Sequence, residues 1–285
     1  MMTQQLIHLS DNTAYMTPVS ETDRPILMAV RGDRHTLLID GGNSVAHAQL
    51  FLQHLKEAGF PAPTLTVVTH WHWDHIFGLA ALSTPIISSG DTKKAMEELV
   101  DFTWDDQAID ERVASGVEIE FCAKAIKEEF QEERDIRIVL PDILFEDELT
   151  LDLGGITCIL RQVGGDHAED SVVVYVKEEK LLFLADCTAQ KMYAPKWYYD
   201  AENTVKLLDT LDQFDAETYV YSHWKPASKE EFQKEATLLR TLAELVTKHE
   251  GNREDMVRAL EVRLEKSPEE DELEVLDYFV NGWHK

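Results

Sequence analysis

The sequence predicts an α/β fold in which strands and helices pack in layers. Short apolar runs that suit strands alternate along the chain with segments whose apolar residues recur at helical spacing. Hydrophobic residues make up 44% of the 285-residue chain, which is enough for a sizeable core. Length alone leaves one or two domains open, and we expect a single domain over residues 1–285 because no flexible linker separates its segments.

The first part of the chain is predicted to form strands, then a helix, then a further strand. Ile26–Val30 and Thr36–Ile39 are short apolar runs on either side of a Gly-Asp turn, as in a hairpin. Ser44–Ala58 follows with apolar residues at helical spacing and ends at a glycine. Leu65–Thr69 is a short β-rich run that delivers the chain directly to His70.

The composition changes between Asp91 and Glu148. This segment contains 19 acidic and 7 basic residues, with apolar positions at roughly helical spacing. We interpret residues 91–148 as a helical insertion that lies on the scaffold and covers the functional site as a lid. A solvated decoration or a dimer contact is the alternative.

Strands and helices resume towards the C-terminus. The predicted strands are Ile136–Leu140, Leu149–Leu153, Ile156–Val163, Ser171–Val176, Lys180–Ala185 and Thr218–Tyr221, with a helix over Thr204–Phe214 before the last strand. Residues 226–285 are predicted to form a C-terminal helical extension, because apolar residues such as Phe232, Ala236 and Leu239 follow the stripe of a helix packed on a core.

The charge excludes some partners. The chain has 54 acidic and 27 basic residues, a formal net charge of −27, and such a surface repels nucleic acids and anionic membranes. No apolar stretch is long enough to span a bilayer, and no secretory signal is predicted. The three cysteines form no metal-type pair and no disulfide framework, so we expect a cytoplasmic location.

The strongest chemical signal lies directly after the strand that ends at Thr69. Three histidines and one aspartate, His70, His72, Asp74 and His75, lie within six residues. Neutral imidazole and carboxylate are good ligands for divalent metals such as zinc. In an extended loop alternate side chains share a side, so His70 and His72 can face one metal, with the other two facing a second.

This motif resembles that of the metallo-β-lactamase superfamily, whose pattern is His-x-His-x-Asp-His after a strand. The superfamily has three further ligands at the ends of later strands, and this sequence has His167, Asp186 and His223 in that order. The resemblance covers about residues 26–223. The surroundings of His167 are more acidic than the family pattern, a departure that concerns the substrate rather than the metals.

The resemblance implies a four-layer αβ/βα sandwich of two mixed sheets, with the helical insertion and the C-terminal helices added to it. It also implies two divalent metal ions with a glyoxalase II- and lactonase-like ligand set. One ion would be held by His70, His72 and His167, and the other by Asp74, His75 and His223, with Asp186 bridging them. Zinc is the favoured metal, and manganese or iron stays open.

The implied function is hydrolysis of a small-molecule substrate. A hydroxide held by two metals would cleave an ester, thioester, lactone or phosphodiester, with Asp74, Asp186 and Tyr193 as catalytic residues. The alternatives are an iron-dependent enzyme like the persulfide dioxygenases and an inert metal-binding scaffold. The oligomeric state is open, with a homodimer as one possibility.

Several other side chains are candidates for substrate contact or support. Trp71, Trp73, Trp224 and Lys225 lie beside ligand candidates, although aromatic residues there can equally pack under the metal loop. Asp40 resembles a turn aspartate that supports this loop. Within the insertion we expect Phe102, Trp104 or Phe130 to reach the substrate.

Overall fold

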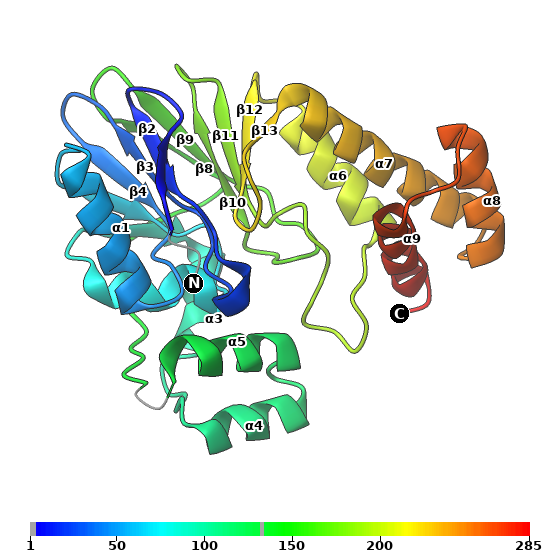
Figure 1. The fold of residues 1–285 in the computed structure, drawn as a ribbon, viewed down its shortest axis with the longest axis horizontal. Helices are drawn as coiled ribbons and strands as arrows, with labels where there is room; N and C mark the ends of the chain where they lie inside the picture. Colours follow the sequence, from blue (N-terminus) through cyan, green and yellow to red (C-terminus); the bar gives the residue numbers. More distant parts are fainter. Residues whose placement is uncertain (1–3, 132–133) are drawn as a thin grey trace.

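The computed structural model describes residues 4–131 and 134–285 as two β-sheets that lie face to face, with helices on their outer sides (Figure 1). Helix α1 (Val45–Glu57) covers the outer face of the first sheet, and the C-terminal helices extend from the second. Helices α4 (Asp106–Ser115) and α5 (Glu120–Phe130) lie together at the bottom of this view. The predicted four-layer α/β sandwich is confirmed.

The first sheet is mixed. Its order follows the sequence, and its strands are β1 (Leu6–His8), β2 (Thr13–Met16), β3 (Leu27–Arg31), β4 (Thr36–Ile39), β5 (Leu65–Val67), β6 (Ile86–Ser89) and β7 (Ile143–Phe145). Strands β1 to β4 pair antiparallel, and β4 to β7 pair parallel. Parallel pairing places the carboxyl ends of β4, β5 and β6 along one edge, where the chain continues into the functional site.

The second sheet is also mixed. Its order is β13-β12-β11-β10-β9-β8, and its strands are β8 (Glu148–Asp152), β9 (Thr157–Gln162), β10 (Val172–Val176), β11 (Leu181–Ala185), β12 (Thr218–Tyr221) and β13 (Ala227–Ser228). Only β11 and β12 pair parallel. Their carboxyl ends therefore lie side by side, directly before Asp186 and shortly before His223.

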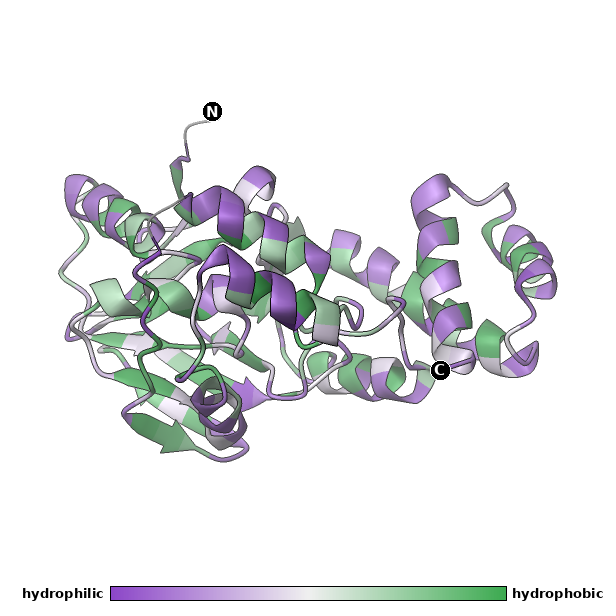
Figure 2. Cartoon of the chain, turned by 90° about the horizontal axis from the view of Figure 1, so that it is seen from below, coloured by the Kyte–Doolittle hydropathy of each residue, from purple (hydrophilic) through white to green (hydrophobic). Residues whose placement is uncertain are grey.

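The main core lies between the sheets. Side chains such as Met28 and Ile39 of the first sheet meet Leu160, Val174 and Phe183 of the second, and all five are fully buried. Strands β10 and β11 are buried on both faces, because the C-terminal helices cover the other side. The strands are mainly green in Figure 2 and most helices carry both colours, as amphipathic helices on a sheet should.

Several helices begin at residues whose side chains cap them. Their bounds are α1 (Val45–Glu57), α2 (Trp73–Ile76), α6 (Ala201–Leu211), α7 (Lys229–Lys248), α8 (Arg253–Leu264) and α9 (Glu270–Trp283), with short 3₁₀ segments η1 (Ser20–Thr22) and η2 (Phe77–Ala81). Ser44 caps α1, and Ser228 with Glu231 forms a capping box on α7. None of the described helices combines the length and the apolar composition needed to cross a bilayer.

The segment over residues 91–148 is helical only in its first part. It contains α3 (Gly90–Glu97), α4 (Asp106–Ser115) and α5 (Glu120–Phe130), and then β7, which belongs to the first sheet. The strand predicted at Ile136–Leu140 was wrong: this run is irregular, and its apolar side chains pack on the buried cluster beneath α4 and α5. The strand follows Pro141 instead, where the chain pairs with β6.

Candidate metal centre

Four of the seven predicted ligands come from the first sheet. His70 and His72 lie in the loop after β5, and Asp74 and His75 lie on the single turn of helix α2 that follows. All four are buried. Two ligand candidates precede this helical turn, and two lie on it, where the chain changes direction.

The other three ligands come from the second sheet. His167 lies in the loop between β9 and β10, Asp186 directly follows β11, and His223 follows β12. Gly165 allows the loop of His167 to lie against the end of β11, because a Cβ there would be 2.6 Å from the Cys187 carbonyl oxygen and its φ is +127°. The ligands thus meet at the edge where strands of both sheets end.

The seven side chains form two groups, each with its ligand atoms within 4.8 Å of one another. The first group is His70, His72 and His167, and the second is Asp74, His75, Asp186 and His223. Asp186 lies between them: its Oδ2 is 2.9 Å from His75 Nε2 and 3.8 Å from His70 Nε2. The structure therefore brings together all seven residues, in the grouping that the resemblance implied.

The ring orientations fit metal ligation. In four of the histidines Nδ1 already has a partner: Thr69 Oγ1 for His70, Asp40 for His75, the Gln190 carbonyl for His167 and Asp23 for His223. Such a partner fixes the ring and leaves Nε2 free to bind a metal. Nε2 of His70 is fully buried without any hydrogen-bond partner, and a bound cation would accept its lone pair.

Asp40 supports the loop as the sequence predicted. Its carboxylate accepts hydrogen bonds from the Thr69 backbone N–H (2.8 Å) and the Thr69 hydroxyl (2.9 Å), and it contacts His75 Nδ1 at 2.8 Å. Asp40 and Ala185, which precede the two halves of the site, both have positive φ, 65° and 51°. Strained backbone of this kind costs about 1–3 kcal/mol per residue and is concentrated at functional sites.

The electrostatics differ between the two groups. Burial lowers the pKa of His70, His72 and His167, so these rings are neutral at pH 7, the form that ligates metals. In the second group burial opposes charge, but the attraction between the carboxylates and the two histidines outweighs it.

As a result, the pKa values of Asp74 and Asp186 lie well below the usual range, and those of His75 and His223 lie well above it. The carboxylates thus draw positive charge into this group, and a divalent cation would supply it in place of protons.

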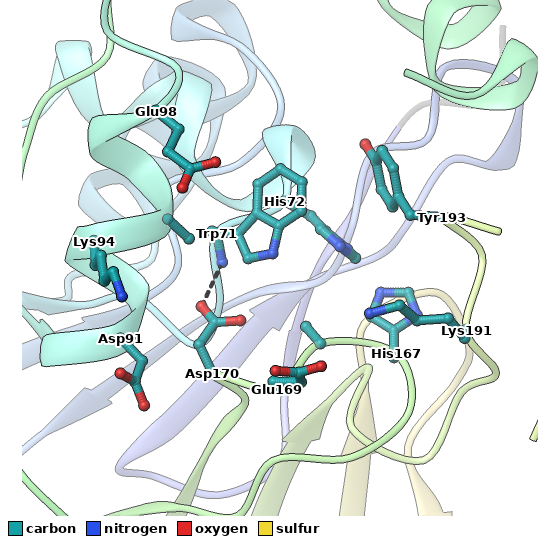
Figure 3. Close-up of a pocket in the computed structure, with 12 residues that line it drawn as sticks. Trp71, His72, Asp91, Lys94, Glu98, His167, Glu169, Asp170, Lys191 and Tyr193 are labelled. Atoms are coloured by element: carbon teal, nitrogen blue, oxygen red, sulfur yellow. Dashed lines mark hydrogen bonds between the residues drawn. The ribbon is translucent and has the colours of Figure 1, made fainter. Parts of the chain in front are cut away.

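A cavity of about 370 Å³ opens onto the ligands, and we call it the metal cavity. Asp74, Asp186 and His223 are among its lining residues, opposite Ile119 and Phe121 of the insertion. A second cavity of about 430 Å³, here the charged cavity, shares His72, His167 and Tyr193 with the first as lining residues. Figure 3 shows the acidic and basic side chains around this second cavity.

The tryptophans beside the ligands have different surroundings. Trp71 lines the charged cavity and contacts the ring of His72, at 4.7 Å between centroids. Trp73 is buried and packs on Phe77, so its role is packing. Trp224 is 66% exposed. Lys225 forms an ion pair with Glu231 and lines neither cavity.

Tyr193 lies between the two cavities and lines both. Its ring is 5.1 Å from that of His72, and its hydroxyl donates to Glu118 Oε1 at 3.0 Å. The hydroxyl thus contacts the insertion and not the ligand side chains, and Figure 3 shows it pointing away from His167. A catalytic role for Tyr193 stays a prediction.

The insertion reaches the metal cavity, but the aromatic residues expected to touch substrate do not. Phe102, Trp104 and Phe130 line neither cavity and belong to the hydrophobic cluster beneath α4 and α5. Trp104 packs on Phe77, at 4.7 Å between ring centroids, and Arg112 lies 4.6 Å over the Trp104 ring. These side chains hold the insertion to the scaffold, so the expectation was wrong for all three.

Sequence reasoning missed three residues of the site. Asp23 contacts His223 Nδ1 at 3.4 Å, and burial with the nearby Asp74 raises the pKa of its carboxyl to about 7. Glu118 holds Tyr193, and Phe121 lines the cavity. No motif marks any of them, although Phe121 and Glu118 lie within the segment that was expected to cover the site.

The chain matches a known protein family in sequence and known structures in fold. The family model described as the metallo-beta-lactamase superfamily matches residues 27–223, which is more than half of the chain and includes all seven ligand candidates. None of the curated proteins is significantly similar to the chain in sequence.

Solved structures resemble the chain at low identity. A metallo-beta-lactamase from Pontibacter korlensis is 20% identical, with 84% of this chain and 99% of the other covered and a TM-score of 0.58. One from Hirschia baltica is 16% identical, with 83% and 97% covered and a TM-score of 0.56. A stereoselective inverting sec-alkylsulfatase from Pseudomonas sp. is 16% identical, with a TM-score of 0.66. The match covers 97% of this chain but only 47% of the sulfatase. At these identities the likeness shows the fold.

Proposed function

Because this chain belongs to the metallo-beta-lactamase superfamily, we propose that it is a metal-dependent hydrolase that cleaves a small ester, thioester, lactone or phosphodiester. The observation that carries the proposal is the convergence of seven ligand side chains, in two groups, at the foot of a cavity large enough for a small molecule. Two divalent cations, with zinc favoured and manganese or iron open, would lower the pKa of water towards about 7 and polarise the reacting bond.

The side chains of the site have distinct tasks in this proposal. Asp186 joins the two groups, and Asp40 fixes the ring of His75. Asp74 both belongs to the second group and lines the metal cavity. We assign to its carboxylate the transfer of a proton to the leaving group.

The test is turnover of a panel of thioesters, esters, lactones and phosphodiesters by protein loaded with zinc, manganese or iron. We expect hydrolysis of at least one class, abolished by a chelator and restored by the metal. His70→Ala should remove the activity, and Lys225→Ala, outside both cavities, should leave it unchanged. Metal-loaded protein that hydrolyses no compound of the panel would contradict the proposal.

A sulfate ester belongs in the same panel. The sec-alkylsulfatase is similar in fold over nearly the whole chain, C-terminal helices included. Hydrolysis of a secondary alkyl sulfate but of no carbonyl or phosphoryl compound would move the proposed reaction to sulfate esters.

We also propose that the chain acts in the cytoplasm on a small molecule and not on nucleic acid. Cys122, Cys158 and Cys187 are free and buried, as suits a reducing compartment. The net charge of −27 disfavours a polyanionic partner.

A further inference from the structure

The two cavities beside the metal centre differ in chemistry. Charged residues dominate the wall of the charged cavity: Asp91, Lys94, Glu98, Glu169, Asp170 and Lys191. Apart from the metal-ligand candidates, the residues that line the metal cavity are mainly apolar: Pro18, Ile119, Phe121, Ala189 and Met192. No lysine or arginine is among the described residues that line it. The transfer of a bound group from water to this apolar wall has a favourable free energy only if the group is apolar.

Phe121 contributes an exposed aromatic ring to the apolar wall. The residue is 44% exposed, although it lines the metal cavity from α5. Its aromatic neighbour is Trp197, at 6.4 Å between ring centroids. An apolar ligand in the cavity would cover this ring, and burial of a phenyl group against a ligand is strongly favourable.

The wall is held in place from two sides. Glu118, just before α5, accepts the hydrogen bond of the Tyr193 hydroxyl, which ties the insertion to the loop that carries Met192. On the other side Asn281 of α9 donates to the Trp197 carbonyl at 2.9 Å. A wall fixed in this way is formed before a ligand binds, so less entropy is lost on binding.

We infer that the substrate carries an apolar acyl or alkyl group, which binds between Ile119, Phe121 and Met192 while the bond to be cleaved lies at the ligand side chains. This inference rests on the proposed hydrolase function, to which it adds a substrate class. Phe121 and Met192 are then residues that determine chain-length specificity.

The first test measures binding without turnover. Straight-chain carboxylates from acetate to octanoate are titrated calorimetrically into metal-loaded protein. Each added methylene should lower Kd about threefold to fourfold until the cavity is filled. Phe121→Ser should flatten this dependence, and Phe121→Leu should retain most of it. Val262→Ser is the matched control, because Val262 is 77% exposed on the distant helix α8. A Kd that does not change with chain length in the wild type overturns the inference.

The second test separates this inference from the proposed function. The kcat/KM for p-nitrophenyl esters and thioesters of the same chain lengths should rise in parallel with affinity. Turnover that is equal for all chain lengths leaves the hydrolase in place and overturns the apolar subsite. Chain-length-dependent binding without hydrolysis of any compound supports the subsite and counts against the hydrolase.

Discussion

Asp186 lies where the two groups of ligand side chains meet. Its Oδ2 approaches His75 Nε2 (2.9 Å), His223 Nε2 (3.6 Å) and His70 Nε2 (3.8 Å). It directly follows Ala185, whose φ of 51° turns the carboxylate out of strand β11. A residue in this position fixes both halves of the site at once.

We expect Asp186→Ala to lower kcat/KM by at least about 100-fold, because loss of residues that merely support a ligand already costs about 10- to 100-fold. The metal content per chain should fall as well. Tyr193→Phe is the comparison, since it keeps the ring beside His72 and removes only the hydroxyl, which donates to Glu118 Oε1 at 3.0 Å and contacts Cys122 Sγ at 3.7 Å. Steady-state kinetics and elemental analysis measure both variants, and an Asp186→Ala rate within a few-fold of wild type would remove Asp186 from the mechanism.

At the residue scale, the sequence indicates the ligand candidates more clearly than the residues that support them. Four of the candidates can be recognised from the sequence because metal-binding side chains are concentrated in one short loop: His70, His72, Asp74 and His75. His167, Asp186 and His223 each follow a strand, and their joint order makes them recognisable. Asp23 supports His223 from a 3₁₀ turn 200 residues earlier in the chain. Nothing in the sequence around Asp23 indicates that contact, because only the folded chain brings the two together.

Helix α9 is the element that secures the loop between β11 and α6. The Tyr199 N–H donates to the Tyr278 carbonyl at 3.1 Å, and Lys285, just after α9, forms an ion pair with Asp200 at 2.8 Å. Gly282 lies directly against this loop: a Cβ there would be 1.9 Å from the Tyr199 carbonyl oxygen. The loop also carries Met192, so the C-terminal helix fixes part of the cavity wall from outside.

Gly282→Ala should therefore force α9 and the loop apart. We expect the free energy of unfolding to fall by about 1–3 kcal/mol, the usual cost of overpacking. Gly90→Ala is the matched control, because a Cβ on that helical glycine has no neighbour within 4 Å. It should stay within about 0.5 kcal/mol of wild type. Urea denaturation measures both, and equal stability of the two variants would show that the close approach at Gly282 is absent in solution.

At the element scale, periodicity reveals which face of a helix is buried but not what covers it. The apolar spacing of the insertion correctly indicates helices, and the same spacing suggested that Phe102, Trp104 and Phe130 reach the substrate. The structure uses these rings to anchor the insertion, and an exposed phenylalanine, Phe121, faces the cavity instead. The strand predicted at Ile136–Leu140 was wrong for a similar reason. Apolar side chains that pack against helices give the same sequence pattern as apolar side chains buried in a sheet.

The metal centre joins the two halves of the whole molecule. His70, His72, Asp74 and His75 follow a strand of the first sheet, and the other three ligands follow strands of the second. Ions bound by both sets would act as a cross-link at the edge of the sandwich, in addition to the hydrophobic core between the sheets. Binding to the folded state alone stabilises it by mass action.

Removal of metal should therefore lower the melting temperature of the entire chain. At a free metal concentration of about 100 times Kd, each ion contributes about 2.7 kcal/mol, which corresponds to a shift of about 4–5 °C for a chain of 285 residues. Scanning calorimetry of zinc-loaded and chelator-treated protein measures the shift. His70→Ala should respond less to the chelator, because one group has lost a ligand. An identical Tm with and without metal, in protein shown by elemental analysis to bind it, would mean that the ions do not join the two sheets.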